Sequence, residues 1–160
     1  MKNLILIRHA KALYEGFATD KERELAVTGI HRSIKVATEC KGILNENFSF
    51  WSSTAERAMG TALVFSELFD IPFDTFHFTD ALYTFDCTEL KKVIQSVPNH
   101  ISNLVVFGHN PAFTDFINQT TNLQIDNLPT SGLVSIEFDT DDWNDLPTGK
   151  VVKTLFAKDL

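Results

Sequence analysis

The sequence predicts an α/β fold in which helices cover both faces of a mostly parallel sheet. Segments with the apolar runs of buried strands alternate with segments whose apolar residues recur at helical spacing. The clearest strands are residues 4–7 and 104–107, each with four consecutive apolar residues, as expected for strands buried on both faces. Two strand-like segments, 132–138 and 151–157, end the chain and predict a hairpin, hence one antiparallel edge strand. We therefore expect residues 1–160 to form one domain, a three-layer α/β/α sandwich.

The first half of the chain alternates between strand and helix. After residues 4–7, a helix with Thr28 as its candidate N-cap is expected. Its predicted buried stripe consists of five residues: Ile30, Ile34, Ala37, Cys40 and Leu44. Residues 48–51 predict a short strand that ends at Ser52-Ser53-Thr54. The next helix has a predicted buried face made of Ala55, Ala58, Ala62, Phe65 and Phe69, and residues 73–78 predict another strand.

The second half continues the alternation. Asp86 or Thr88 is expected to start a helix with four inward residues: Leu90, Val93, Ile94 and Val97. After the strand at 104–107, Asn110 as N-cap and Pro111 at the first helical position predict a helix with Phe113, Phe116 and Ile117 buried. The acidic connection 139–145 lacks the glycine and terminal glutamate of a calcium loop, so we expect a solvated turn there.

Composition argues against several classes of function. The 160 residues include 14 Lys and Arg against 21 Asp and Glu, for a net charge of −7. Broad binding to nucleic acids or anionic membranes needs a basic surface, so neither partner is expected. No segment approaches the roughly 20 apolar residues of a membrane span, and the apolar run before Arg8 is too short for a signal peptide. With Cys40 and Cys87 expected as buried reduced thiols, we predict a cytoplasmic protein.

Basic and imidazole side chains follow several predicted strands. Arg8 and His9 end the first strand, His109 follows residues 104–107, and Arg57 lies within a turn of the helix after Ser53. Ligands of open α/β sheets bind beyond the carboxyl ends of strands, so we expect these four side chains to meet. Each alone is an ordinary polar residue at a strand end or on a helix; their joint placement is the signal.

Such a set suits a tetrahedral dianion. Guanidinium groups match phosphate oxygens, and a neutral histidine presents a lone pair to phosphorus. The remaining histidines, His31, His77 and His100, have no metal-binding spacing and are expected to be bystanders. We expect neither a metal nor a cofactor.

Four segments together resemble the histidine phosphatase superfamily. Residues 6–12 (LIRHAKA) resemble its opening signature, residues 52–62 (SSTAERAMGTA) its second motif and residues 106–111 (VFGHNP) its third. The short length and the Arg-His-Ala-Lys opening are closest to the SixA-type phosphohistidine phosphatases. Residues 20–25 (DKEREL), with Thr28-Gly29, resemble a further stretch of that group.

The resemblance implies a metal-independent phosphatase that works through a covalent phosphohistidine. His9 is the implied nucleophile, Arg8, Arg57 and His109 the implied ligands of the phosphoryl oxygens, and Arg23 an implied residue at the pocket edge. The implied partner is a phosphorylated protein, through its phosphohistidine, or a small phosphorylated substrate, with phosphate as the product.

The sequence departs from the superfamily pattern in ways that bear on the substrate. Ala10 replaces a common glycine, Thr54 a common proline, and Glu24 the proline after Arg23. Residues 79–86 lack the glutamate that protonates an alcohol leaving group in related enzymes, which favours the less demanding imidazole leaving group of phosphohistidine.

Two alternatives stay open at this point. The first is a phosphatase for small phosphate esters, in which Asp80, Asp86 or Tyr83 serves as the acid. The second is a phospho-ligand binding module without turnover, although a binding module has no need of a nucleophile such as His9.

Overall fold

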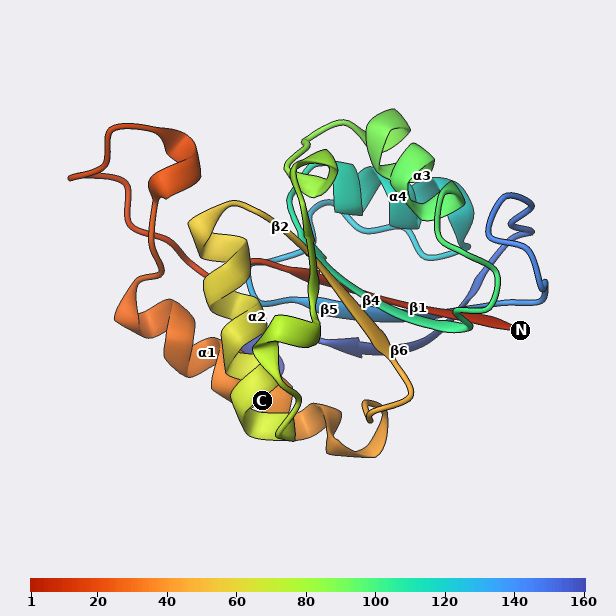
Figure 1. Ribbon diagram of the computed structural model, residues 1–160, viewed down its shortest axis with the longest axis horizontal. Coiled ribbons are helices and arrows are strands. Elements are labelled where there is room, and N and C mark those ends of the chain that lie inside the picture. Colours follow the sequence, from red (N-terminus) through yellow and green to blue (C-terminus); the bar gives the residue numbers. More distant parts are fainter.

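The strands of this computed structural model, which describes residues 1–160, form one six-stranded sheet in the order β3-β2-β4-β1-β5-β6 (Figure 1). Their bounds are β1 Lys2–Arg8, β2 Ser49–Ser53, β3 His77–Thr79, β4 Asn103–Gly108, β5 Leu133–Phe138 and β6 Lys150–Leu155. Strands β1 to β4 run parallel, β5 pairs antiparallel with β1, and β6 pairs antiparallel with β5. The mostly parallel sheet is confirmed. Only β5 runs antiparallel to both of its neighbours. It is not the edge strand, because β6 pairs with its outer side.

Helices cover both faces of the sheet, which confirms the three-layer architecture (Figure 1). The α-helices are α1 Val27–Glu39, α2 Glu56–Phe69, α3 Cys87–Gln95 and α4 Ala112–Thr120. Helices α1 and α2 share one buried cluster with the sheet, and α3 and α4 share the other. The longest helix, α2, has 14 residues, and no helix combines the length and hydropathy of a membrane span.

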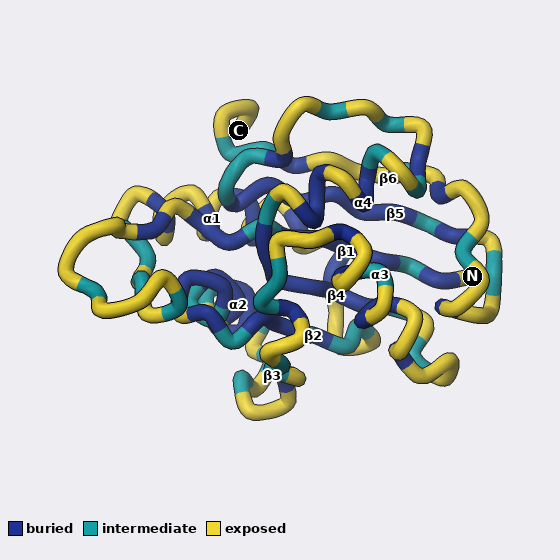
Figure 2. Tube along the Cα trace, turned by 90° about the horizontal axis from the view of Figure 1, so that it is seen from above, coloured by how far each residue is buried: buried dark blue, intermediate teal, exposed yellow.

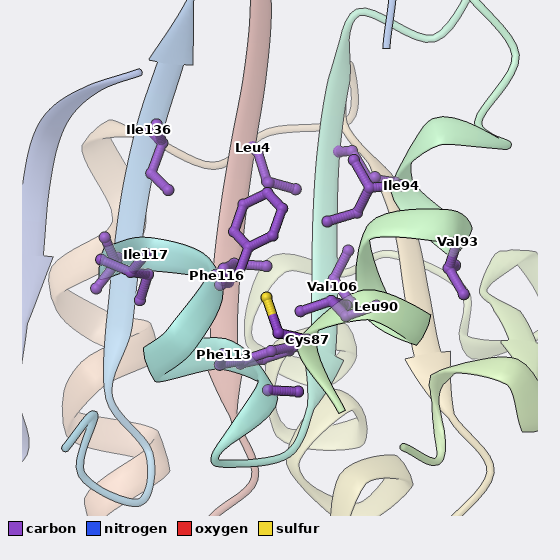
Figure 3. Close-up of a cluster of buried hydrophobic side chains, with 14 of the residues drawn as sticks. Leu4, Cys87, Leu90, Val93, Ile94, Val106, Phe113, Phe116, Ile117 and Ile136 are labelled. Atoms are coloured by element: carbon purple, nitrogen blue, oxygen red, sulfur yellow. The ribbon is translucent and has the colours of Figure 1, made fainter. Parts of the chain in front are cut away.

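The side chains of the central strand β1 point alternately into the two buried clusters. Leu4 and Leu6 point into the cluster under α3 and α4, whereas Ile5 and Ile7 point into the cluster under α1 and α2. Figure 3 shows the first cluster, where Phe113 and Phe116 of α4 lie against the strands, and Figure 2 shows how completely the inner strands are covered. The apolar run at residues 4–7 is therefore a strand buried on both faces, as predicted.

The two cysteines are free and buried, as predicted. Cys40 belongs to the cluster under α1 and α2, and Cys87 to the cluster on the opposite face. The sheet separates the two thiols, so each fills space in its own core.

The predicted buried stripe of α1 was wrong for two residues. Ile30 and Ile34 are 37% and 42% exposed, and the helix instead buries Gly29, Ser33, Val36 and Ala37. The reason is close packing: a Cβ on Gly29 would lie 2.3 Å from the backbone oxygen of Lys11. The small face of α1 approaches the chain after β1, and the two isoleucines turn toward solvent.

Other boundaries differ locally. Residues Phe73–Thr75 form a 3-10 turn ahead of the short strand β3, where a longer strand was predicted. Helix α1 begins at Val27, with Ala26 rather than Thr28 in the capping position. Asp86 does cap α3, accepting the Thr88 N–H at 2.9 Å. Asn110 accepts the Thr114 N–H at 3.1 Å, although α4 itself begins at Ala112.

Candidate active site

The ends of the two central strands bring the two histidines together. Strands β1 and β4 are parallel neighbours with Arg8 opposite Gly108, so His9 and His109 each follow at the same edge of the sheet. The His9 N–H donates to the Gly108 carbonyl at 3.0 Å. The ring centroids lie 5.2 Å apart. Parallel register thus produces the predicted convergence of residues 100 positions apart in the chain.

Hydrogen bonds fix the tautomer of His9. Its Nδ1 lies 2.7 Å from the Ala10 carbonyl oxygen, which can only accept, so Nδ1 carries the hydrogen. On the other side of the ring, Arg57 Nε donates to His9 Nε2 at 3.3 Å. An Nε2 that accepts has a lone pair, and this is the form a histidine nucleophile requires.

Burial keeps this ring neutral. The pKa of His9 falls to about 4, chiefly through burial, with smaller contributions from the positive charges of Arg57 and Arg8. Desolvation is thus a larger cause than repulsion by the surrounding arginines. At neutral pH His9 Nε2 therefore keeps its lone pair, which accepts the Arg57 N–H.

His109 is oriented by Ser53 at the end of β2. Its Nε2 lies 2.8 Å from Ser53 Oγ, which also accepts the Ala55 N–H at 3.1 Å. When the Ser53 hydroxyl donates to Nε2, the hydrogen of the neutral ring resides on Nδ1, and this buried atom has no partner within the protein. Burial, with the nearby His9, lowers the pKa of His109 to about 3.

Arg57 joins the site through the first turn of α2 and is 2% exposed. Its Nη1 and Nη2 donate to the backbone oxygen and Oδ2 of Asp20, at 2.8 and 2.9 Å. Asp20 Oδ2 also accepts from the Tyr83 hydroxyl, and Oδ1 from Arg23 Nη1 at 3.0 Å. These bonds, with the Tyr83 bond first among them, hold the pKa of Asp20 well below its usual range. The carboxylate therefore fixes the guanidinium that faces His9.

Arg8 offers the second unsatisfied group. Its Nη1 donates to the Leu128 carbonyl at 2.8 Å, while its Nε is buried without a partner. Arg8 Nε and His109 Nδ1 are the only buried side-chain polar atoms lacking partners. Buried donors are normally satisfied, so two unsatisfied ones beside a neutral histidine indicate a place for an anion. We use the name anion pocket for this group of four residues, Arg8, His9, Arg57 and His109.

Arg23 and the three candidate acids occupy different places. Arg23 binds Asp20 and the Leu13 carbonyl, so its contact with the anion pocket is indirect. Asp80 accepts from Thr54 and Lys21, and these bonds lower its pKa, so it is a poor proton donor. Asp86 caps α3. Tyr83 packs against His109, with 5.4 Å between the ring centroids, and its hydroxyl donates to Asp20.

The histidines expected to be bystanders lie elsewhere. His77 packs against Trp51 at 4.5 Å between ring centroids, and His31 and His100 are exposed.

Sequence reasoning missed the residues that hold the pocket together. Asp20, Ser53 and Thr61 were within the quoted motifs but received no role. The Thr61 hydroxyl accepts the Ala10 N–H at 2.9 Å and donates to the Arg57 carbonyl at 2.8 Å, which ties the end of β1 to α2. Motif position was the available signal; only the contacts reveal what each residue does.

Comparison with known proteins shows a shared fold. No family profile and no curated protein matches the sequence. Among solved structures, the protein histidine phosphatase SixA complexed with tungstate superimposes with a TM-score of 0.80 over 98% of both chains, at 19% identity.

Two further solved structures have the same fold with lower TM-scores. A protein assigned as the phosphohistidine phosphatase SixA from Agrobacterium tumefaciens gives a TM-score of 0.78 over 97% of both chains, at 18% identity. A phosphoserine phosphatase from Entamoeba histolytica, in complex with 3-phosphoglyceric acid, gives 0.68 over 96% of both chains, at 15% identity. The chain therefore has the fold of these phosphatases.

Proposed function

We propose that this protein is a phosphatase that hydrolyses phosphohistidine through a covalent phosphohistidine on His9. The Nε2 lone pair attacks phosphorus, and the bond from phosphorus to the substrate nitrogen breaks. With its other nitrogen protonated, the substrate imidazole leaves as a neutral ring. Water then attacks phosphorus, the bond to Nε2 breaks, and phosphate and a proton leave while His9 regains its neutral form.

The observation that carries this proposal is the state of His9. Its Nε2 holds a lone pair beside Arg57, and Arg8 and His109 each have a buried donor without a partner in the protein. Phosphoryl transfer needs a positioned nucleophile and positive charge around the equatorial oxygens. The two arginines and the His109 N–H supply that charge and those hydrogen bonds.

The missing carboxylic acid favours a phosphorus–nitrogen bond over an ester. Asp80 and Asp86 are held by other contacts, and Asp20 is ionised between arginines and Tyr83. An alcohol leaving group needs a general acid, whereas a protonated imidazole leaves as a neutral ring. Phe85, 47% exposed and 5.4 Å from His109 between ring centroids, offers the leaving imidazole an aromatic neighbour.

The proposed substrate is a phosphohistidine carried by a protein. The SixA structures similar to this chain carry the same activity in their names.

We propose the cytoplasm as the location of this protein, which fractionation of cells tests. A small phosphate ester as substrate, and anion binding without turnover, are the alternative outcomes of the experiment below.

The experiment compares turnover and covalent labelling. Wild-type protein is given free phosphohistidine, phosphoramidate and the alcohol ester phosphoserine, and the labelled protein is trapped with acid or base. We expect hydrolysis of the two phosphorus–nitrogen compounds to exceed that of the ester, and a label that is labile in acid and stable in base. His9→Ala is expected to abolish both the label and the turnover.

His31→Ala is the matched control, since His31 is exposed on α1. A label that survives in His9→Ala would remove His9 as the nucleophile. Faster hydrolysis of the ester than of phosphohistidine would replace the proposed substrate class, and tight phosphate binding without any turnover would select the binding module.

A further inference from the structure

A groove with an apolar floor and an acidic rim lies between α1 and α2. It encloses about 510 Å³. Its floor includes Leu25, Ile30, Met59 and Leu63, and its rim carries three glutamates, Glu24, Glu56 and Glu67. We call this feature the acidic groove.

The floor is apolar surface left open by the fold. Ile30 is 37% exposed and Leu63 is 40% exposed. A Cβ on Gly60 would lie 3.0 Å from Leu25 Cδ1, so the missing side chain lets Leu25 lie directly against α2. Ile30, one of the two residues that were wrongly predicted to be buried, therefore contributes to this exposed apolar surface. Contiguous exposed apolar surface with a polar rim is typical of a protein interaction site.

The charges on the rim all have the same sign. The only charged side chains that line the acidic groove are the three glutamates, and none of them forms an ion pair within the protein. Their carboxylates are therefore free to interact with cations of a partner. A second copy of this chain is a poor occupant, because its own acidic groove would face these carboxylates and each copy has a net charge of −7.

Two glutamates of the acidic groove are next in the chain to arginines of the site. Glu56 precedes Arg57 at the start of α2, and Glu24 follows Arg23, which binds Asp20. In Figure 1 the segment before α1 projects on the side where α1 and α2 begin. A protein that delivers a phosphoryl group to His9 would therefore also contact the acidic groove.

We propose that the acidic groove docks an amphipathic helix of the phosphorylated substrate protein, with apolar side chains on the floor and Lys or Arg against the rim. This inference rests on the proposed function for the identity of the partner. Helix-in-groove recognition supplies the apolar contacts, and the opposite charges supply orientation and a faster approach.

Two fluorescent helical peptides with the same apolar stripe test the docking, one flanked by lysines and the other by glutamates. Fluorescence anisotropy measures their binding without any chemistry. We expect the lysine peptide to bind at least about ten-fold more tightly at low salt, with the difference shrinking as salt rises. The triple variant E24Q/E56Q/E67Q is expected to lose this preference, and Leu63→Glu to weaken both peptides.

The control variant E39Q/E46Q/E89Q removes the same charge from exposed glutamates outside the groove lining. It is expected to keep the preference. Equal binding of the two peptides by the wild type would overturn the proposal, as would a preference that survives in E24Q/E56Q/E67Q. A stable dimer in light scattering that Leu63→Glu dissolves would also overturn it, because a second copy would then be the occupant.

A second arm separates this inference from the proposed function. Free phosphohistidine reports the chemistry alone, and its kcat/KM is expected to stay within about two-fold in all groove variants, since none touches the reacting atoms. With the lysine peptide carrying phosphohistidine, kcat/KM is expected to fall at least about ten-fold in E24Q/E56Q/E67Q. Peptide binding without any hydrolysis would defeat the proposed function and leave the docking intact. Hydrolysis without a peptide preference would defeat the docking alone.

Discussion

The anion pocket and the acidic groove are neighbours along α2 with opposite construction. In the pocket, Arg57 is 2% exposed and His109 is 1% exposed, and hydrogen bonds fix the orientation of each. In the groove, Leu63 is 40% exposed and the rim carboxylates have no partners within the chain. The helix therefore presents a buried cation on one side and open apolar surface with acid on the other.

The difference separates chemistry from recognition. Water competes for every hydrogen bond and charge, so groups that stabilise a transition state are more effective when buried and preorganised. Recognition of another protein instead requires surface that both partners can desolvate together. Changes in the pocket are thus expected to alter turnover, and changes in the groove to alter the choice of partner.

After the loss of turnover expected for His9→Ala, the largest expected effect comes from Arg57→Lys. Lysine keeps the charge but loses the planar fork that reaches His9 and Asp20 at once, so kcat for free phosphohistidine is expected to fall about 10²–10³-fold. Steady-state kinetics measure this, and anisotropy with the lysine peptide is expected to show unchanged docking. Arg32→Lys, on the exposed surface of α1, is the matched control. An unchanged kcat would show that Arg57 does not stabilise the transition state.

The pH dependence tests the effect of burial in the pocket. Protonated His9 has no lone pair, and its lowered pKa of about 4 means that the neutral form persists well below the ordinary value. We expect kcat/KM for phosphoramidate to stay level from neutral pH down to about 5 and then to fall about ten-fold per unit below the pKa. Rates are corrected for spontaneous hydrolysis, and circular dichroism monitors the fold. A midpoint near the ordinary value of histidine would contradict a desolvated His9.

A smaller effect is expected when the carboxylate beside the pocket is neutralised. Asp20 holds Arg57 and Arg23, and its negative charge opposes an incoming phosphate. Asp20→Asn removes the charge and keeps an acceptor, so the inhibition constant for inorganic phosphate is expected to fall about ten-fold. Asp126→Asn, at an exposed position, is the control. Weaker phosphate inhibition in Asp20→Asn would show that positioning of Arg57 outweighs repulsion.

The smallest effect concerns the contribution of the exposed face of α1 to stability. Ile34 on α1 is 42% exposed, so Ile34→Ser is expected to change the free energy of unfolding by less than about 0.5 kcal/mol. Val36, two residues later, is fully buried, and Val36→Ala is expected to cost roughly 2 kcal/mol. Urea denaturation measures both. Similar losses for the two variants would mean that this face of α1 is covered in solution.

The sequence predicted the class of fold and the four pocket residues because both rest on local patterns. Runs of apolar residues mark strands buried on both faces, and parallel strands bring their carboxyl ends to one edge. The rotation of α1 could not be predicted in this way. Ile30 and Ile34 match the helical period as well as the residues that are buried, and the choice depends on the contact between Gly29 and Lys11.

The amino-acid order alone determined which segments become strands and helices, and that Arg8, His9, Arg57 and His109 follow or flank strand ends. Tertiary structure decided the protonation state of His9, the support of Arg57 by Asp20, and the open apolar surface between α1 and α2. The physical reason is how far apart in the chain the interacting residues lie. Strand and helix propensity act over a few residues, whereas desolvation, hydrogen-bond partners and surface exposure depend on segments brought together from distant parts of the chain.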